Sequence, residues 1–342
     1  MTEINCPVWW KSTLEDVEET LALVKRGTVT ELARSAGGRP IYKVKYGKSN
    51  VKMGSANLSS ALGAHDVKCF ADKTGDDYVP TLFLDGAVHG GEFEGTMSLL
   101  NLIKEIETGT DYNGDTHPTL MDLVSRVHLV IIPVSNPDGR ARIPFRSFLG
   151  RTFEDLRYYN QGTWKKDGTL CGWPGCKTIH PIKEASDFLG AYFNDDGYNM
   201  MHEDYFDNPS NETRAVFDIC RHEAPDFSVL LHGGTNTTSS ILYPTYHMRD
   251  AWEEVDTVSH AFEAHLKAEG LKYYRNEKGI YASYCLPEAM YHICGTPCVT
   301  FESNQGLLDA PGDTYTAEVI HKTHLILFEE LCRFILEKFG KI

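Results

Sequence analysis

The sequence has no apolar run close to the roughly 20 residues that span a bilayer, and its first residues lack the basic and then apolar pattern of a secretion signal. It also contains no repeat and no segment rich in glycine, proline or serine that would act as a linker. These absences argue against a membrane protein and against a repeat array. We expect a soluble, cytoplasmic protein that forms a single domain over residues 1–342 and has no membrane partner.

Positive charge is scarce, with 33 Lys and Arg residues against 48 Asp and Glu residues and a formal net charge of −15. Proteins that bind nucleic acid neutralise its phosphates with Lys and Arg, so no nucleic-acid partner is expected. The acidic balance slightly favours neutral or cationic substrates. Nine cysteines, an odd number scattered along the chain, favour reduced intracellular thiols over a disulfide framework.

Apolar residues are present in the amount and order that an α/β core needs. Of the 342 residues, 42% are hydrophobic and 24% are charged, which is enough to bury one large core. Apolar runs of strand length alternate with segments of helical period. We therefore predict an α/β fold, a mixed, mostly parallel twisted sheet with helices on both faces. Helices are expected at residues 13–24, 91–106, 211–223, 250–269 and 317–339.

The most informative segment is residues 81–94, where an apolar run ends in a glycine-rich turn that carries His89 and Glu92. Glycines let the backbone turn sharply, so the imidazole and the carboxylate can face one point. The alternative is a capped turn with an incidental histidine. The spacing favours the start of a zinc site, for which a third ligand must come from elsewhere in the chain.

Two further apolar runs end in residues that complete such a site. Residues 227–231 lead into His232 and two glycines, and residues 297–301 lead into Glu302. Two histidines and one carboxylate leave a fourth zinc position open, which is the arrangement of a catalytic site. Glu302 is then placed to act as the general base, the alternative being a buried structural ion pair. Ligands at the carboxyl ends of strands also favour an open α/β sheet.

Taken in order, these motifs resemble the zinc carboxypeptidase family typified by carboxypeptidase A. Residues 35–41 resemble the family's Ser-x-x-Gly-Arg-Pro-Ile strand, residues 89–92 its His-x-x-Glu motif and residues 136–139 its Asn-Pro-Asp-Gly turn. His232 and Glu302 follow in the family's order, so the resemblance covers most of the chain. It implies one zinc ion per chain, held by the ligands predicted above.

The resemblance also implies a mechanism in which zinc and Glu302 activate a water molecule against an amide carbonyl, with Glu302 as base and then acid. The family stabilises the oxyanion with an arginine a few residues beyond the Asn-Pro-Asp-Gly turn. We assign this role to Arg146, since residues 144–150 resemble the Tyr-Arg-x-x-Leu-x-Gly stretch of the cytosolic branch. The competing arginines are Arg140, Arg142 and Arg151.

Substrate contacts follow from the resemblance with one departure. Tyr281 matches the mobile tyrosine that covers the substrate, and Asn199 matches the asparagine of the Asn-Arg pair that holds a terminal carboxylate. Met200 stands where that arginine belongs, and a methionine cannot bind a carboxylate. Either another cation such as Arg151 or Arg157 replaces the arginine, or the substrate presents no carboxylate at this place.

The remaining features are a glutamate and an insertion near the predicted site, and two further groups of possible metal ligands. Glu288 lies near where the family reads the substrate side chain and would favour a basic or amino-bearing group, and an insertion at about residues 158–193 reshapes the mouth of the site. A second metal site at Cys171, Cys176 and His180 is disfavoured, because only three ligands are near. On the last predicted helix we interpret two histidines, His321 and His324, as exposed polar residues rather than a chelating pair.

The sequence therefore predicts a zinc metallopeptidase, specifically a metallocarboxypeptidase that releases the C-terminal residue of a peptide substrate. One alternative is a deacylase or amidase of the succinylglutamate desuccinylase and aspartoacylase type, acting on an N-acyl amino acid. Another is a non-catalytic zinc-binding module. The presence of both histidines, Glu92 and Glu302 argues against the latter.

Overall fold

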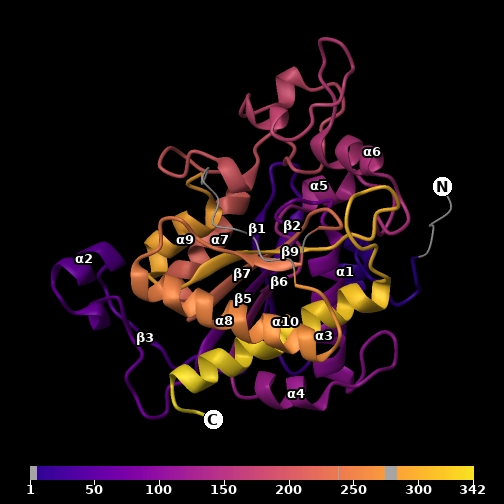
Figure 1. The fold of residues 1–342 in the computed structure, drawn as a ribbon. Coiled ribbons are helices and arrows are strands. Elements are labelled where there is room, and N and C mark those ends of the chain that lie inside the picture. Colours follow the sequence, from indigo (N-terminus) through magenta and orange to yellow (C-terminus); the bar gives the residue numbers. More distant parts are fainter. Residues whose placement is uncertain (1–5, 238, 274–282) are drawn as a thin grey trace.

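A sheet of seven strands forms the centre of the protein in the computed structural model, which describes residues 6–237, 239–273 and 283–342 (Figure 1). The strands are β1 (Thr28–Arg34), β2 (Pro40–Tyr46), β6 (His128–Ile132), β5 (Thr81–Gly86), β7 (Phe227–Gly233), β9 (Cys298–Ser303) and β8 (Ser240–Leu242), in that order across the sheet. The four central strands, β6, β5, β7 and β9, run parallel, and the outer pairings are antiparallel. The predicted mixed sheet is confirmed.

Alternation along the central strands divides the core into two layers. In β5, Leu82 and Leu84 belong to the hydrophobic cluster on one face of the sheet, whereas Phe83 between them belongs to the cluster on the other face. Successive side chains of a strand point to opposite faces, so a strand buried on both sides reads as a continuous apolar run. The run that the sequence shows before His89 is therefore a fully buried central strand.

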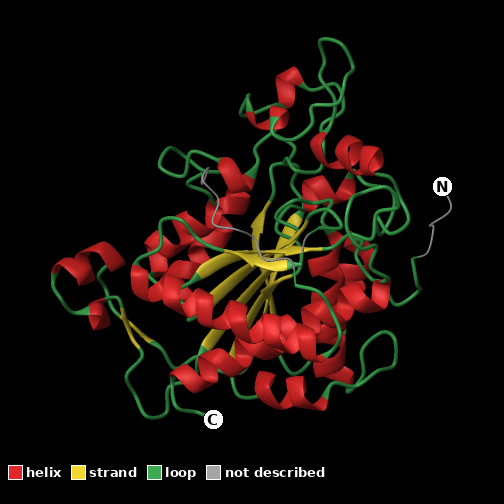
Figure 2. Cartoon of the chain, viewed as in Figure 1, coloured by secondary structure: helices red, strands yellow, loops and turns green. Residues whose placement is uncertain are grey.

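Helices cover both faces, as predicted (Figure 2). One face is covered by α3 (Phe93–Thr108), α4 (Pro118–Val124), α8 (Arg249–Ala268) and α10 (Ala317–Lys338), and the other by α7 (Asn211–Glu223) and α9 (Leu286–Cys294). The shorter elements are α1 (Leu14–Leu21), α2 (Leu58–Gly63), α5 (Pro137–Ala141), α6 (Phe153–Leu156) and the two-stranded sheet of β3 (Lys52–Met53) and β4 (Ala71–Asp72). Among the described helices, none combines the length and the apolar composition that crossing a membrane requires.

Two sequence expectations about helices need correction. The second predicted helix begins at Phe93 rather than at residue 91, because the turn before it carries His89 and Glu92. His321 and His324 are not exposed, with relative exposures of 6% and 0%. Their helix α10 packs against α3, α4 and α8 as well as the sheet, so several of its sides are covered.

The predicted insertion, residues 158–193, has little regular structure and extends above the sheet at the top of Figure 1. It contains the end of a helical turn over Arg157–Gln161 and two short turns, η3 (Gly175–Lys177) and η4 (Lys183–Ala185). A small hydrophobic cluster that includes Cys171, Cys176 and Ile182 stabilises it. The insertion thus has its own packing and forms a wall over one end of the sheet.

Candidate functional site

Three predicted ligands meet at the carboxyl edge of the sheet. Glu92 bridges the two histidines, with its Oε1 2.9 Å from His89 Nδ1 and its Oε2 2.6 Å from His232 Nδ1. One donor atom from each of the three residues lies within 4.8 Å of the others. The turn after β5 and the end of β7 are adjacent because β5 and β7 are paired in parallel. The structure therefore brings together the residues that the sequence assigned to a metal.

The environment of these side chains suits a divalent cation. Glu92 and His232 are each 2% exposed. Burial alone would raise the pKa of Glu92, but the two neighbouring histidines outweigh it and hold the pKa at about 2. Gly90 is needed in the turn, since a Cβ there would lie 2.2 Å from the backbone nitrogen of Arg140. Two imidazole nitrogens and an ionised carboxylate form a donor set that fits zinc.

Glu302 lies beside this cluster on the neighbouring strand. In the parallel pairing of β7 with β9, Glu302 is the register partner of His232. Its side chain is partly exposed and lines a cavity of about 800 Å³ that also contains the three ligands. Burial, together with the charge of Glu92, raises the pKa of Glu302 to about 7. A carboxyl group with this pKa, open to a cavity, can exchange a proton near neutral pH.

The structure does not bring the predicted oxyanion arginine to the cavity. Arg146 Nε lies 3.5 Å from Asp16 Oδ2, and its side chain is not among those lining the cavity. Arg151 is also away from the cavity, with its guanidinium 3.7 Å from the centre of the Phe145 ring. Residues 144–151 pack against α1 and the residues before it, since Trp10 Nε1 donates to the backbone oxygen of Arg146 and Arg146 itself approaches Asp16 of α1. This packing explains why these arginines point away from the predicted ligands. Neither Arg146 nor Arg151 therefore lies at the cavity that contains the three predicted zinc ligands.

Asn199 lies behind a ligand rather than on the cavity surface. Its Oδ1 is 3.2 Å from His89 Nε2, and its backbone nitrogen donates to His180 Nε2 at 2.8 Å. Met200, which follows it, is fully buried in the core. A histidine that coordinates through Nδ1 carries its hydrogen on Nε2, so Asn199 Oδ1 is placed to accept that hydrogen bond and fix the ring. The position predicted to contact substrate thus supports His89.

We expect Asn199→Ala to lower zinc affinity about 10- to 100-fold, which is the usual effect of removing such a supporting hydrogen bond. Competition with a chromogenic chelator measures the affinity directly. Asn199→Asp keeps an acceptor for His89 Nε2 and serves as the matched control, with affinity close to that of the wild type. Equal zinc affinity in the alanine variant and the wild type would contradict this role.

Two further substrate assignments have different outcomes. Glu288 lines the cavity, but its carboxylate accepts hydrogen bonds from the backbone nitrogens of Thr245 and Tyr246 and contacts His247 Nδ1 at 2.9 Å. It therefore anchors residues 245–247, and its role in reading a substrate side chain stays a prediction. Tyr281 lies outside the described residues.

Several side chains at the cavity carry no sequence motif. Tyr192 stacks on His89 with ring centres 4.0 Å apart and an angle of 23° between the planes. Lys177 Nζ lies 2.7 Å from His202 Nε2, and both residues line the cavity. Arg157, named from the sequence only as a substitute cation, lines it as well. Tyr192 and Lys177 belong to the insertion, and no pattern in a segment without regular structure predicts which of its residues turn inward.

Only one other group of possible metal ligands occurs in the described part of the chain. It consists of His265, Glu329 and Glu330 on α8 and α10. Arg333 Nη2 lies 2.8 Å from Glu329, so an internal cation already pairs with this cluster. Cys171, Cys176 and His180 do not form such a group among the described residues.

Comparison with known proteins gives a family and a fold. The sequence profile of the zinc carboxypeptidase family matches residues 22–296, which contain the three ligands but stop short of Glu302. No curated protein sequence matches the chain.

Solved structures that resemble this one include metallocarboxypeptidases of low sequence identity. A metallo-carboxypeptidase from Burkholderia cenocepacia aligns with a TM-score of 0.60 and 16% identity, covering 95% of this chain and 70% of that chain. Carboxypeptidase A from Helicoverpa armigera aligns with a TM-score of 0.54 and 15% identity, over 97% of this chain and 74% of that chain. At these identities the similarity establishes the fold, and the details of the site rest on the residues described above.

Proposed function

Because this chain belongs to the zinc carboxypeptidase family, we propose that it is a zinc-dependent metallocarboxypeptidase that releases the C-terminal residue of a peptide. The observation that carries the proposal is the meeting of His89, Glu92 and His232 at one edge of the sheet, with Glu302 beside His232. This arrangement offers a buried ligand set and a separate carboxylate, the two parts that hydrolysis of an amide by an activated water requires.

The ligand set defines how the cation is held. His89 and His232 would bind one zinc ion through Nδ1, the atoms that face Glu92, and Glu92 would bind it through its carboxylate. Bound zinc supplies Lewis acidity toward a carbonyl and lowers the pKa of water. Tyr192 stacks on His89 and Asn199 faces its other nitrogen, so the ring is held from two directions.

Glu302 performs the proton transfers. As a carboxylate it takes a proton from the attacking water, and as a carboxylic acid it returns that proton to the leaving amine. A pKa of about 7 suits both roles near neutral pH. Its strand β9 is buried between β7 and β8, which keeps the carboxyl group in a fixed position relative to His232.

A deacylase acting on an N-acyl amino acid remains the second candidate, and Met200 is the observation in its favour. This side chain is fully buried and offers no charge to a substrate carboxylate. An enzyme whose specificity lies in an acyl group does not need a cation at that position.

A panel of peptides with free and amidated C-termini tests the proposal, with mass spectrometry identifying the bond that breaks. Release of the last residue from free-carboxylate peptides, lost with a chelator and restored by zinc, is the expected result. Cleavage confined to an acyl group would favour the deacylase. Zinc binding without chelator-sensitive hydrolysis of any amide would favour a binding module and overturn the proposal.

A further inference from the structure

In the part of the chain that the structure describes, the arginine and lysine side chains of the cavity come from one segment, residues 157–177. Among the described residues that line the cavity, Arg157 and Lys177 are the only arginine and lysine. They lie at the start of the insertion and within it, whereas the carboxylates that line the cavity, Glu92, Glu288 and Glu302, come from other segments of the chain. Because the chain has a formal net charge of −15, two cations that line the same cavity suggest a site for an anionic group.

Lys177 has a neutral partner instead of an acid. Its Nζ lies 2.7 Å from His202 Nε2 and 5.1 Å from the centre of the Trp173 ring. Burial, together with the charge of Lys177, lowers the pKa of His202 to about 3, so this imidazole is an uncharged acceptor. The described residues place no carboxylate within ion-pair distance of Lys177. Glu302 and Glu92 act on Lys177 only from beyond ion-pair distance, so its ammonium group faces the cavity with His202 as its hydrogen-bond partner.

Arg157 likewise has no ion-pair partner among the residues that the structure describes. No described residue accepts a hydrogen bond from its guanidinium, whereas Arg142 pairs with Asp195 and Arg39 pairs with Asp138 and Asp195. Its guanidinium lies against Gly172, where an added Cβ would be 2.6 Å from Arg157 Nη2. The backbone of the insertion thus leaves room for this guanidinium. Arginine supplies a planar pair of donors that matches a carboxylate.

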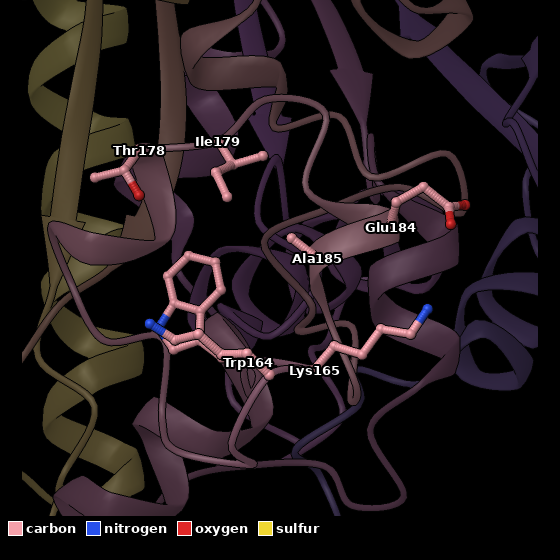
Figure 3. A pocket seen from close by; sticks show the side chains of 7 residues that line it. Trp164, Lys165, Thr178, Ile179, Glu184 and Ala185 are labelled. Carbon is pink, nitrogen blue, oxygen red and sulfur yellow. The ribbon is translucent and has the colours of Figure 1, made fainter.

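The turn that carries Lys177 has two distinct sides. Lys177 faces the large cavity, whereas the next two residues, Thr178 and Ile179, line a smaller hollow of about 430 Å³ within the insertion (Figure 3). That hollow is also lined by Lys165 and Glu184 and holds none of the predicted zinc ligands. Lys165 thus provides a lysine of the same insertion that is absent from the main cavity.

We propose that Arg157 and Lys177 bind a carboxylate of the substrate. The inference rests on the proposed function, because it assumes that the bond to be cleaved lies at the zinc ligands of the same cavity. The observations behind it concern only Arg157 and Lys177, which line the same cavity and have no ion-pair partner among the described residues. A carboxylate can come from the C-terminus or from an acidic terminal side chain, and it fits an arginine fork and an ammonium group equally in either case.

Four peptides and three variants test this proposal. The peptides share one sequence and end in alanine or glutamate, each with a free or amidated C-terminus. We expect Lys177→Met and Arg157→Gln each to raise KM about 10- to 100-fold for peptides that carry the recognised carboxylate, the usual range for a hydrogen bond to a charged group. We expect kcat to change little, and Lys165→Met to behave as the wild type.

The four peptides identify the source of the carboxylate. If only peptides with a free C-terminus are cleaved, whether they end in alanine or glutamate, the recognised group is the terminal carboxylate. If the amidated peptide that ends in glutamate is still cleaved, the recognised group is the glutamate side chain. The proposal would be overturned if Lys177→Met and Arg157→Gln lost the same amount of kcat/KM on all four peptides. It would also be overturned if they lowered kcat on amidated peptides and left KM unchanged, because the cations would then act elsewhere.

A binding measurement separates this inference from the proposed function. Calorimetry with the zinc-loaded Glu302→Gln protein reports peptide affinity without turnover. If the wild type cleaves no peptide, yet carboxylate-bearing peptides bind and lose affinity with Lys177→Met, the inference stands and the proposed function fails. If wild-type protein cleaves peptides while both substitutions leave affinity and KM unchanged, the inference fails and the proposed function stands.

Discussion

Replacing Glu302 by glutamine will lower kcat for peptide hydrolysis by about 10²- to 10⁴-fold, the usual contribution of a positioned general base. Glutamine has nearly the same size and cannot accept the proton. The position is the register partner of His232 and is partly exposed to the cavity, so the change removes no core packing. Zinc content and melting temperature should stay at the wild-type values, since Glu302 is not in the ligand set.

The pH dependence of hydrolysis by the wild type and by Glu302→Gln provides a second measurement. Glu302 must be ionised to act as a base, so kcat/KM should fall as the pH drops through its pKa. Burial raises that pKa to about 7, and a nearby divalent cation draws it down, so the acid limb should have its midpoint at or below about 7. The residual activity of Glu302→Gln should lack this limb. Glu184→Gln, at the hollow of Figure 3, is a matched carboxylate control.

A glutamine variant that retains wild-type kcat, or that keeps the acid limb, would contradict the role of Glu302 as base. A parallel loss of zinc would instead show that the carboxylate helps to hold the metal. Metal analysis of the purified variant therefore accompanies the kinetics.

The grouping of His89, Glu92 and His232 was predictable because these residues follow strands that the sequence shows clearly. Apolar runs before His89, His232 and Glu302 are central parallel strands, whose carboxyl ends necessarily meet at one edge. The glycines after two of these runs marked the turns. A local pattern therefore predicted a contact between residues that are 140 positions apart, such as Glu92 and His232.

The directions in which the arginines and the side chains of the insertion point were not predictable in the same way. Arg146 lies in a segment without strand or helix, and whether it faces the cavity depends on how that segment packs against α1. Lys177 reaches the cavity from a turn with no periodicity. His321 and His324 were wrongly predicted to be exposed, since an amphipathic pattern does not reveal that neighbouring helices cover the sides of α10. In each case the deciding contacts are tertiary.

Replacing His232 by alanine will reduce bound zinc to a small fraction of one ion per chain and lower hydrolysis by about 10³-fold or more. The imidazole is 2% exposed on a central strand, so no other described side chain can move in to replace Nδ1. Lewis acidity from the metal supplies several kcal/mol of transition-state stabilisation, and each 1.4 kcal/mol is tenfold in rate.

Thermal unfolding with and without zinc gives an independent measure of this loss. A ligand that binds only the folded state stabilises it by about 4 kcal/mol at a thousand times its Kd, so zinc should raise the melting temperature of the wild type and of Glu302→Gln but not of His232→Ala. His265→Ala, which removes a histidine of the other acidic cluster, should respond to zinc as the wild type does. Zinc-dependent hydrolysis in His232→Ala, or its loss in His265→Ala, would place the catalytic metal elsewhere, because the chemistry must follow the ligands that hold the ion.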